Sequence, residues 1–178
     1  MGDGELVTFD TGGGSTEFVY GKGASMLRKF SVTLGAVRIT EEFFREDPVL
    51  PGAVERAEAE IVKSLKDGGV SGRTDFLVGM GGTVTSLASV KFKMAVYDPD
   101  IVQGSTLTLD EINAQIADYA GKTLEQRRAI VGLQPKRADV ILAGACIVRA
   151  ICTLLGVASF TVSDRGLRHG LVYELFTK

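Results

Sequence analysis

Residues 6–21 read LVTFDTGGGSTEFVYG and combine two β-favouring runs with a glycine turn. The runs at 6–9 and 18–20 predict two strands. The turn between them contains Gly12, Gly13 and Gly14. Because glycine has no Cβ, we expect this turn to adopt positive φ and to leave N–H groups free for an anion such as a phosphoryl group. The alternative interpretation is an ordinary glycine-rich hairpin.

Two carboxylates flank this turn. Asp10 ends the first run and Glu17 opens the second, so an antiparallel hairpin would bring both carboxylates to its turn end. A cation such as Mg²⁺ uses one or two carboxylates together with phosphate oxygens. The pattern therefore predicts Mg²⁺, or another divalent cation, between Asp10 and Glu17. Two solvated acids are the alternative.

A second glycine loop follows another predicted strand. The run at 74–78 leads into GMGGT at 79–83, and a helical pattern occupies 84–90. This arrangement favours an anion, because the first N–H groups of a helix are free and its dipole is positive there. The loop has neither the ending of a Walker A motif nor the spacing of a dinucleotide fingerprint. A tight packing turn is the alternative.

Basic residues gather after a predicted helix that begins near residue 124. They are Arg127, Arg128, Lys136 and Arg137. A guanidinium group can donate two parallel hydrogen bonds to a phosphate, so this cluster is a candidate binding site for the outlying phosphates of a substrate. The alternative is a solvated charged face. The single histidine, His169, has no Ser or Cys nucleophile motif to partner it and is predicted to lie on the surface.

Composition narrows the classes of partner. The chain has 178 residues, 45% of them hydrophobic, and a formal net charge of −2, which provides no global basic field for nucleic acid or an anionic membrane. The amino terminus shows no signal-peptide pattern, and the apolar run at 140–148 is too short to cross a bilayer. Cys146 and Cys152 lie on well-separated faces of one predicted helix. We expect a reduced, cytoplasmic protein with neither nucleic-acid nor membrane partners.

The remaining patterns predict an α/β protein with a mixed sheet. A third strand is expected at 26–34 and a last one at 160–162. Helices are expected at 36–44, 53–66, from 109 and 124 with capping boxes, at 138–155 and at 163–175, with a loop at 92–104.

Five stretches that span nearly the whole chain occur in a recognisable order. They are DTGGGSTEFVYG (10–21), SVTLGAVRITEEFF (31–44), VGMGGTVTSLA (78–88), RADVILAGACIV (137–148) and SDRGLRHGL (163–171). In this order they resemble the exopolyphosphatase and guanosine pentaphosphate phosphatase family, within the actin, Hsp70 and sugar-kinase superfold. The resemblance implies one ribonuclease H-like half of that superfold, β-β-β-α-β-α-β-α with helical insertions and with helices on both faces of the sheet.

The resemblance also implies a site. Asp10 and Glu17 match the family's catalytically important, metal-associated acids. The matching phosphate contacts are Gly12, Gly13, Gly14, Ser15 and Thr16 in the first loop, Gly81, Gly82 and Thr83 in the second, and Arg137 near a distal phosphate. The family's general base is a glutamate that precedes the Asp-x-Gly-Gly-Gly stretch, and this chain begins too late to contain it.

The expected function is hydrolysis of the terminal phosphoanhydride bonds of inorganic polyphosphate or of guanosine pentaphosphate. Residues 1–178 are expected to form one domain, the phosphate- and metal-binding second half of a two-domain phosphatase whose first half is absent. Such a chain is expected to be inactive alone and to self-associate as a homodimer. The alternatives are a nucleotide-binding half-domain of the chaperone or actin kind, and a regulatory or scaffold domain without chemistry. Glu17 favours hydrolysis, because mere nucleotide binding does not need an acid directly after the glycine turn.

Overall fold

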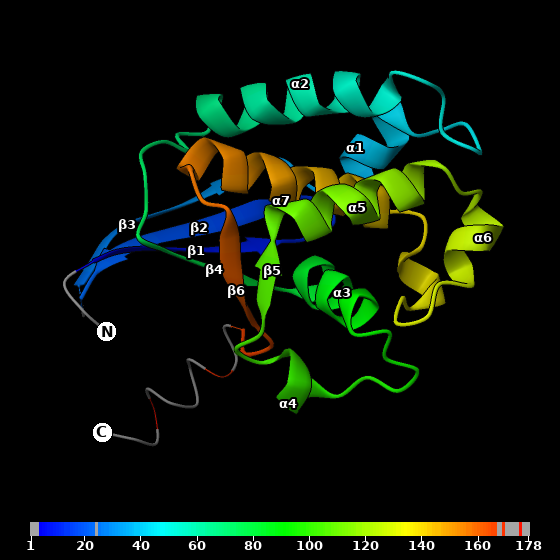
Figure 1. Cartoon of the computed structure of the whole chain (residues 1–178). Coiled ribbons are helices and arrows are strands. Elements are labelled where there is room, and N and C mark those ends of the chain that lie inside the picture. The colour runs from blue at the N-terminus through cyan, green and yellow to red at the C-terminus, as the bar shows by residue number, and fades with distance from the viewer. Residues whose placement is uncertain (1–3, 24, 167–168, 170–174, 176–178) are drawn as a thin grey trace.

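A six-stranded mixed sheet forms the frame of the computed structural model, which describes residues 4–23, 25–166, 169 and 175 (Figure 1). Its strand order is β3-β2-β1-β4-β6-β5. The strands are β1 (Glu5–Thr11), β2 (Thr16–Lys22), β3 (Ser25–Val32), β4 (Phe76–Met80), β5 (Thr106–Thr108) and β6 (Ser159–Ser163). The predicted α/β class with a mixed sheet is therefore confirmed.

The pairing of the strands decides where a site can form. Strands β1, β2 and β3 make an antiparallel meander, while β1 pairs with β4, and β4 with β6, in parallel. The carboxyl ends of the parallel strands β1, β4 and β6 therefore lie next to each other at the same end of the sheet. In open α/β sheets, ligands bind outside the carboxyl ends of such strands. The two glycine loops follow β1 and β4, so the topology brings both loops to the carboxyl ends of these neighbouring strands.

Close packing at the centre of the sheet explains one glycine of the second motif. Phe9 on β1 and Phe160 on β6 meet edge to face, with ring centroids 5.5 Å apart, across the intervening strand β4. A Cβ at Gly79 would lie 2.7 Å from an atom of each ring. Gly79 is thus a packing glycine within β4, and the loop proper starts after Met80.

The helices stack on the sheet around α7. They are α1 (Ala36–Phe43), α2 (Ala53–Asp67), α3 (Gly82–Lys91), α4 (Pro99–Val102), α5 (Leu109–Ala120), α6 (Leu124–Arg128), the 3₁₀ turn η1 (Pro135–Arg137) and α7 (Ile141–Leu155). Figure 1 shows α2 and α7 on the same side of the sheet, and α7 packs against both α2 and α5. This burial from several sides explains why α7 is apolar nearly all round. Its one cation, Arg149, reaches Glu58 of α2 at 2.9 Å.

Two predicted elements differ from the structure. The stretch predicted as a loop at 92–104 contains α4, and β5 follows it, because a four-residue helix and a three-residue strand are too short for a periodic pattern. The helix predicted from 138 starts at Ile141, after the 3₁₀ turn. The closing helix predicted at 163–175 falls largely outside the described residues. Within the described part, no helix has the length and apolar character that a membrane crossing requires.

Candidate functional site

Asp10 and Glu17 face each other across the first hairpin. They are direct partners in the β1–β2 register, so their side chains lie on the same face of the sheet. Burial, followed by the negative charge of Glu17, raises the pKa of Asp10 above its ordinary value. The hairpin thus creates the carboxylate pair that the sequence predicts.

This pair fits a cation that is shared with phosphate. Among the described residues, no group of three or more His, Cys, Asp or Glu side chains could hold a metal ion alone. Mg²⁺ commonly takes one or two carboxylates and completes its shell with water and phosphate oxygens. A cation beside Asp10 would also offset the repulsion and desolvation that raise the pKa of this carboxyl.

Two serine hydroxyls hold Glu17. Ser15 Oγ donates to Glu17 Oε1 at 2.5 Å, and Ser31 Oγ donates to the same oxygen at 2.9 Å. Ser31 belongs to β3, where it stands opposite Glu17 in the register. Sequence reasoning missed Ser31, because only the register of the third strand places it beside the turn.

The first glycine loop packs tightly against the start of α1. The carbonyls of Gly12 and Gly13 accept hydrogen bonds from the N–H groups of Ala36 and Val37, at 3.0 and 2.9 Å. Among the described residues, the N–H groups of Gly13 and Gly14 have no acceptor. They therefore remain available to an anion.

The backbone prediction for this loop is wrong. None of Gly12, Gly13 and Gly14 has positive φ. Glycine is favoured at position 13 because helix α1 packs closely against it, and not because the backbone is left-handed. A Cβ on Gly13 would lie 3.1 Å from Val37 Cγ2. Thr16 is buried and donates its hydroxyl to the carbonyl of Leu34 at 2.8 Å. Its side chain supports the loop from inside.

In the second loop, the positive φ belongs to Gly81. Gly81 is the N-cap of α3, with φ 87°, and no side chain caps this helix. A Cβ on Gly81 would lie 2.0 Å from Asp10 Oδ1. The backbone of the second loop therefore touches the carboxylate of the first hairpin, and the two predicted loops form one site.

Arg137 lies on the other side of the same loop. A Cβ on Gly82 would lie 2.1 Å from Arg137 Nη2, so the guanidinium group covers the first turn of α3. Arg137 makes no ion pair with any described residue. Thr83 is buried, and its methyl group packs against Gly144 of α7. The start of α3 thus lies between an acid and a free cation.

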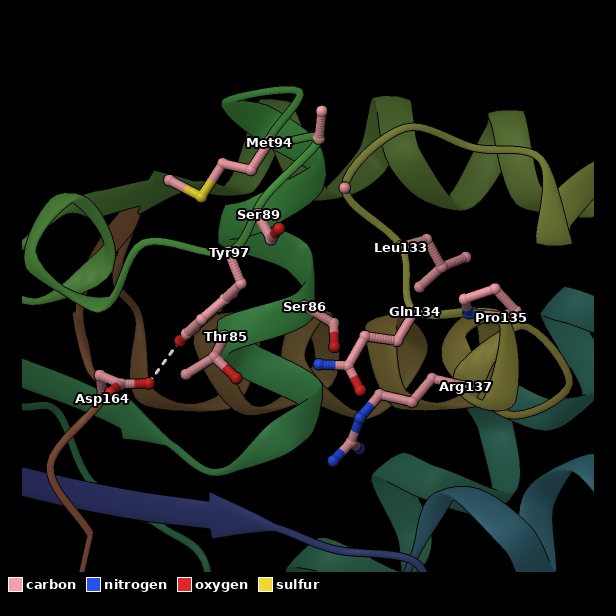
Figure 2. A pocket seen from close by; sticks show the side chains of 12 residues that line it. Thr85, Ser86, Ser89, Met94, Tyr97, Leu133, Gln134, Pro135, Arg137 and Asp164 are labelled. Atoms are coloured by element: carbon pink, nitrogen blue, oxygen red, sulfur yellow. Dashed lines mark hydrogen bonds between the residues drawn. The ribbon is translucent and has the colours of Figure 1, made fainter.

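A pocket of about 370 Å³ opens beside Arg137 (Figure 2). Its α3 wall carries hydroxyl groups, and its other walls combine apolar residues with the polar side chains of Gln134, Arg137 and Asp164. The lining residues are Thr85, Ser86, Ser89, Met94, Ala95, Tyr97, Gly132, Leu133, Gln134, Pro135, Arg137 and Asp164. Tyr97 donates a hydrogen bond to Asp164, and burial together with this acid raises the pKa of Tyr97 to about 12. Sequence reasoning missed this pocket, because its walls come from four separate segments.

The predicted basic cluster is divided. Arg137 joins the site, whereas Arg127 is buried, with 4% of its side chain exposed, and lies 3.8 Å from Asp47. Arg128 and Lys136 are exposed. His169 is also exposed, as predicted.

Comparisons with known proteins identify relatives of this chain. The sequence model of the Ppx/GppA phosphatase family matches residues 1–178. The chain is 35% identical over 173 residues to the bifunctional 3-dehydroquinate synthase/phosphatase of Fusobacterium nucleatum, covering 95% of this chain and 26% of that protein. It is 30% identical over 177 residues to exopolyphosphatase 2 of Mycobacterium tuberculosis, covering 96% and 55%.

A solved structure shows the same fold. The Aquifex aeolicus Ppx/GppA phosphatase matches with a TM-score of 0.92 at 35% identity, over 98% of this chain and 58% of that one. The predicted fold, one half of the actin-like architecture, is thereby confirmed. The chain spans about half the length of the exopolyphosphatase and of the Aquifex protein, and about a quarter of the bifunctional relative.

Proposed function

Because the chain belongs to the Ppx/GppA phosphatase family, we propose that it supplies the phosphate- and metal-binding half of an enzyme that hydrolyses terminal phosphoanhydride bonds. The observation that carries the proposal is the contact of Gly81 with Asp10 and of Gly82 with Arg137. Acid, backbone amides and guanidinium meet at one helix start. Hydrolysis of this kind depends mainly on positioning and charge neutralisation.

Each group has a separate role in this proposal. Asp10 and Glu17 would hold a divalent cation such as Mg²⁺, which neutralises phosphate charge when it is bound. The free N–H groups of Gly13 and Gly14 and those of the first turn of α3 would bind phosphate oxygens, as helix starts and glycine loops do. Arg137 would neutralise a further phosphate. The general base belongs, by family resemblance, to a glutamate on a first domain that closes the cleft.

The pocket favours guanosine pentaphosphate over inorganic polyphosphate as the preferred substrate. Its lining contains one cation, Arg137, and one acid, Asp164. An extended polyanion would need several cations along its path, whereas a neutral nucleoside suits a lining that mixes hydroxyl and amide groups with apolar side chains. We assign the nucleoside to this pocket and its phosphate chain to the glycine loops.

The test is phosphate release from both substrates by the protein in its full natural length. With Mg²⁺, Glu17→Gln should lower turnover by about a hundredfold or more, the range for loss of a transition-state charge contact. Ala95→Phe, which narrows the pocket, should raise the KM for guanosine pentaphosphate alone, by about tenfold. The matched control is Val96→Phe, because Val96 is 82% exposed and does not line the pocket. Full turnover by Glu17→Gln would contradict the proposed catalytic role.

A further inference from the structure

The end of strand β3 is bonded to the proposed catalytic acid. Ser31 donates to Glu17 Oε1, the same oxygen that Ser15 Oγ binds. Among the described residues, no donor reaches Glu17 Oε2. The protein therefore fixes one oxygen of this carboxylate and leaves the other to a ligand.

The chain that follows Ser31 is bonded to the glycine loop. Ala36 and Val37 donate their N–H groups to the carbonyls of Gly12 and Gly13. In a trans peptide unit, the C=O and the following N–H point in opposite directions. Holding these two carbonyls toward α1 therefore directs the N–H groups of Gly13 and Gly14 away from it.

Gly35 allows this contact. A Cβ at this position would lie 2.2 Å from the carbonyl oxygen of Gly13 and 2.4 Å from the nitrogen of Gly14. Gly35 has φ −141° and ψ 164°, an extended conformation that any residue adopts. Glycine is therefore required for space alone, and a single methyl group would displace the loop.

We propose that residues 31–37, here called the support segment, position the cation and phosphate site without touching either ligand. Ser31 sets the orientation of Glu17, and Gly35 with the start of α1 sets the direction of the amides of Gly13 and Gly14. The inference rests on the proposed function, because it assumes that Glu17 binds a cation. Partners that orient a ligating side chain typically contribute about 10- to 100-fold to metal affinity.

The first test measures Mn²⁺ binding by electron paramagnetic resonance, with tripolyphosphate present to supply the phosphate oxygens that the site lacks. Ser31→Ala should weaken Mn²⁺ binding by about tenfold or more. Ser31→Thr keeps a hydroxyl at an exposed strand position and should restore the affinity. Ser25→Ala is the matched control, because Ser25 lies at the other end of the same strand, opposite Lys22. It should bind Mn²⁺ like the wild type.

The second test measures the loop. Gly35→Ala should shift the ¹H–¹⁵N signals of Gly13 and Gly14 and weaken the binding of tripolyphosphate in the presence of Mn²⁺ by about tenfold or more. Gly121→Ala is its control, since a Cβ there meets its nearest neighbour at 3.5 Å. If Gly35→Ala does not fold, the Ser31 variants decide the matter.

The outcomes separate this inference from the function on which it rests. Wild-type affinity for Mn²⁺ in Ser31→Ala, while the wild type binds the ion, overturns the support segment and leaves the proposed function intact. Absence of Mn²⁺ binding by the wild type overturns the cation site and, with it, the inference. Equal loss in Ser31→Thr and Ser31→Ala also overturns it, because the hydroxyl would then be irrelevant.

Discussion

Asp10 is the residue at which the two glycine loops meet. It is the penultimate residue of β1, opposes Glu17 across the hairpin and touches the backbone of Gly81. Its position is unfavourable for a carboxylate, since burial and a neighbouring negative charge both raise its pKa. An acid kept in such a place indicates a cost to stability that a bound cation would relieve.

The cost to stability can be measured as a dependence of the Tm on pH. Because the pKa of Asp10 is raised from 3.8, the fold favours the protonated form, and the stability that this group contributes is lost as the pH rises through the raised value. Asp10→Asn should therefore raise the Tm at pH 7, by roughly 1–4 °C, and the gain should shrink as the pH falls toward 4. Calorimetry at both pH values checks this, with Asp100→Asn as the exposed control. A Tm gain independent of pH would contradict the assignment.

Gly81 and Gly72 form a matched pair for a second prediction. Both have strongly positive φ, 87° and 93°, but only Gly81 has a neighbour in the way of a Cβ. Gly72→Ala should cost about 1–3 kcal/mol of backbone strain and leave Mn²⁺ binding unchanged. Gly81→Ala should cost more and also abolish Mn²⁺ binding, because its Cβ displaces Asp10. Urea unfolding and Mn²⁺ titration measure both effects, and equal losses in the two variants would refute the contact.

At the residue scale, the sequence predicted the acids but misassigned the backbone. Asp10 and Glu17 were predictable because they flank a turn whose ends must meet. The turn at Gly12, Gly13 and Gly14 was expected to adopt positive φ, and none of these three glycines does. A run of glycines does not reveal whether it provides freedom of φ or room for a neighbour. That distinction depends on α1, which packs against the loop from another part of the chain.

At the element scale, the start of α3 depends on its contact with α7. Thr83 of α3 packs against Gly144 of α7, where a Cβ would lie 2.5 Å from Thr83 Cγ2. The turn that is proposed to bind phosphate is therefore held by the close approach of two helices. Helix positions of this kind were predictable from the periodic pattern, but the crossing point was not, because it requires knowledge of which faces meet.

A double-mutant cycle tests this contact. Gly144→Ala should lower the free energy of unfolding by about 1–3 kcal/mol through overpacking. Thr83→Ser removes the obstructing methyl group and should recover most of the loss, a coupling of about 1 kcal/mol or more. Thr85→Ser, on the same helix, should not rescue. Additive losses in Gly144→Ala combined with Thr83→Ser would show that the helices do not meet there.

At the scale of the whole molecule, the order of the motifs predicted the architecture. Strand, glycine loop and strand, followed by strand, glycine loop and helix, place both loops at the carboxyl edge of the sheet. The pocket beside Arg137 was not predictable, since α3, residues 94–97, residues 132–137 and Asp164, which follows β6, converge only after folding. The local sequence pattern thus predicts the helices and strands, whereas contacts between segments that are distant in the sequence form the pocket.

The isolated chain should release no appreciable phosphate from polyphosphate. In the proposed function the base belongs to another domain, and without that domain the loops would face open water, where charge interactions are weak. A phosphate assay on the isolated chain checks this, with light scattering to report the predicted homodimer. Rapid release would place the base in this chain, and Glu17 and His169 would then be the first residues to replace.

The central claim is that Asp10, Glu17 and the two glycine loops bind a phosphate chain through a divalent cation. Calorimetric titration of this chain with tripolyphosphate, with and without Mg²⁺, tests it most directly. We predict that binding requires Mg²⁺ and weakens by about tenfold or more in either Asp10→Asn or Glu17→Gln. Binding of equal strength without Mg²⁺, or in both variants, would contradict the claim.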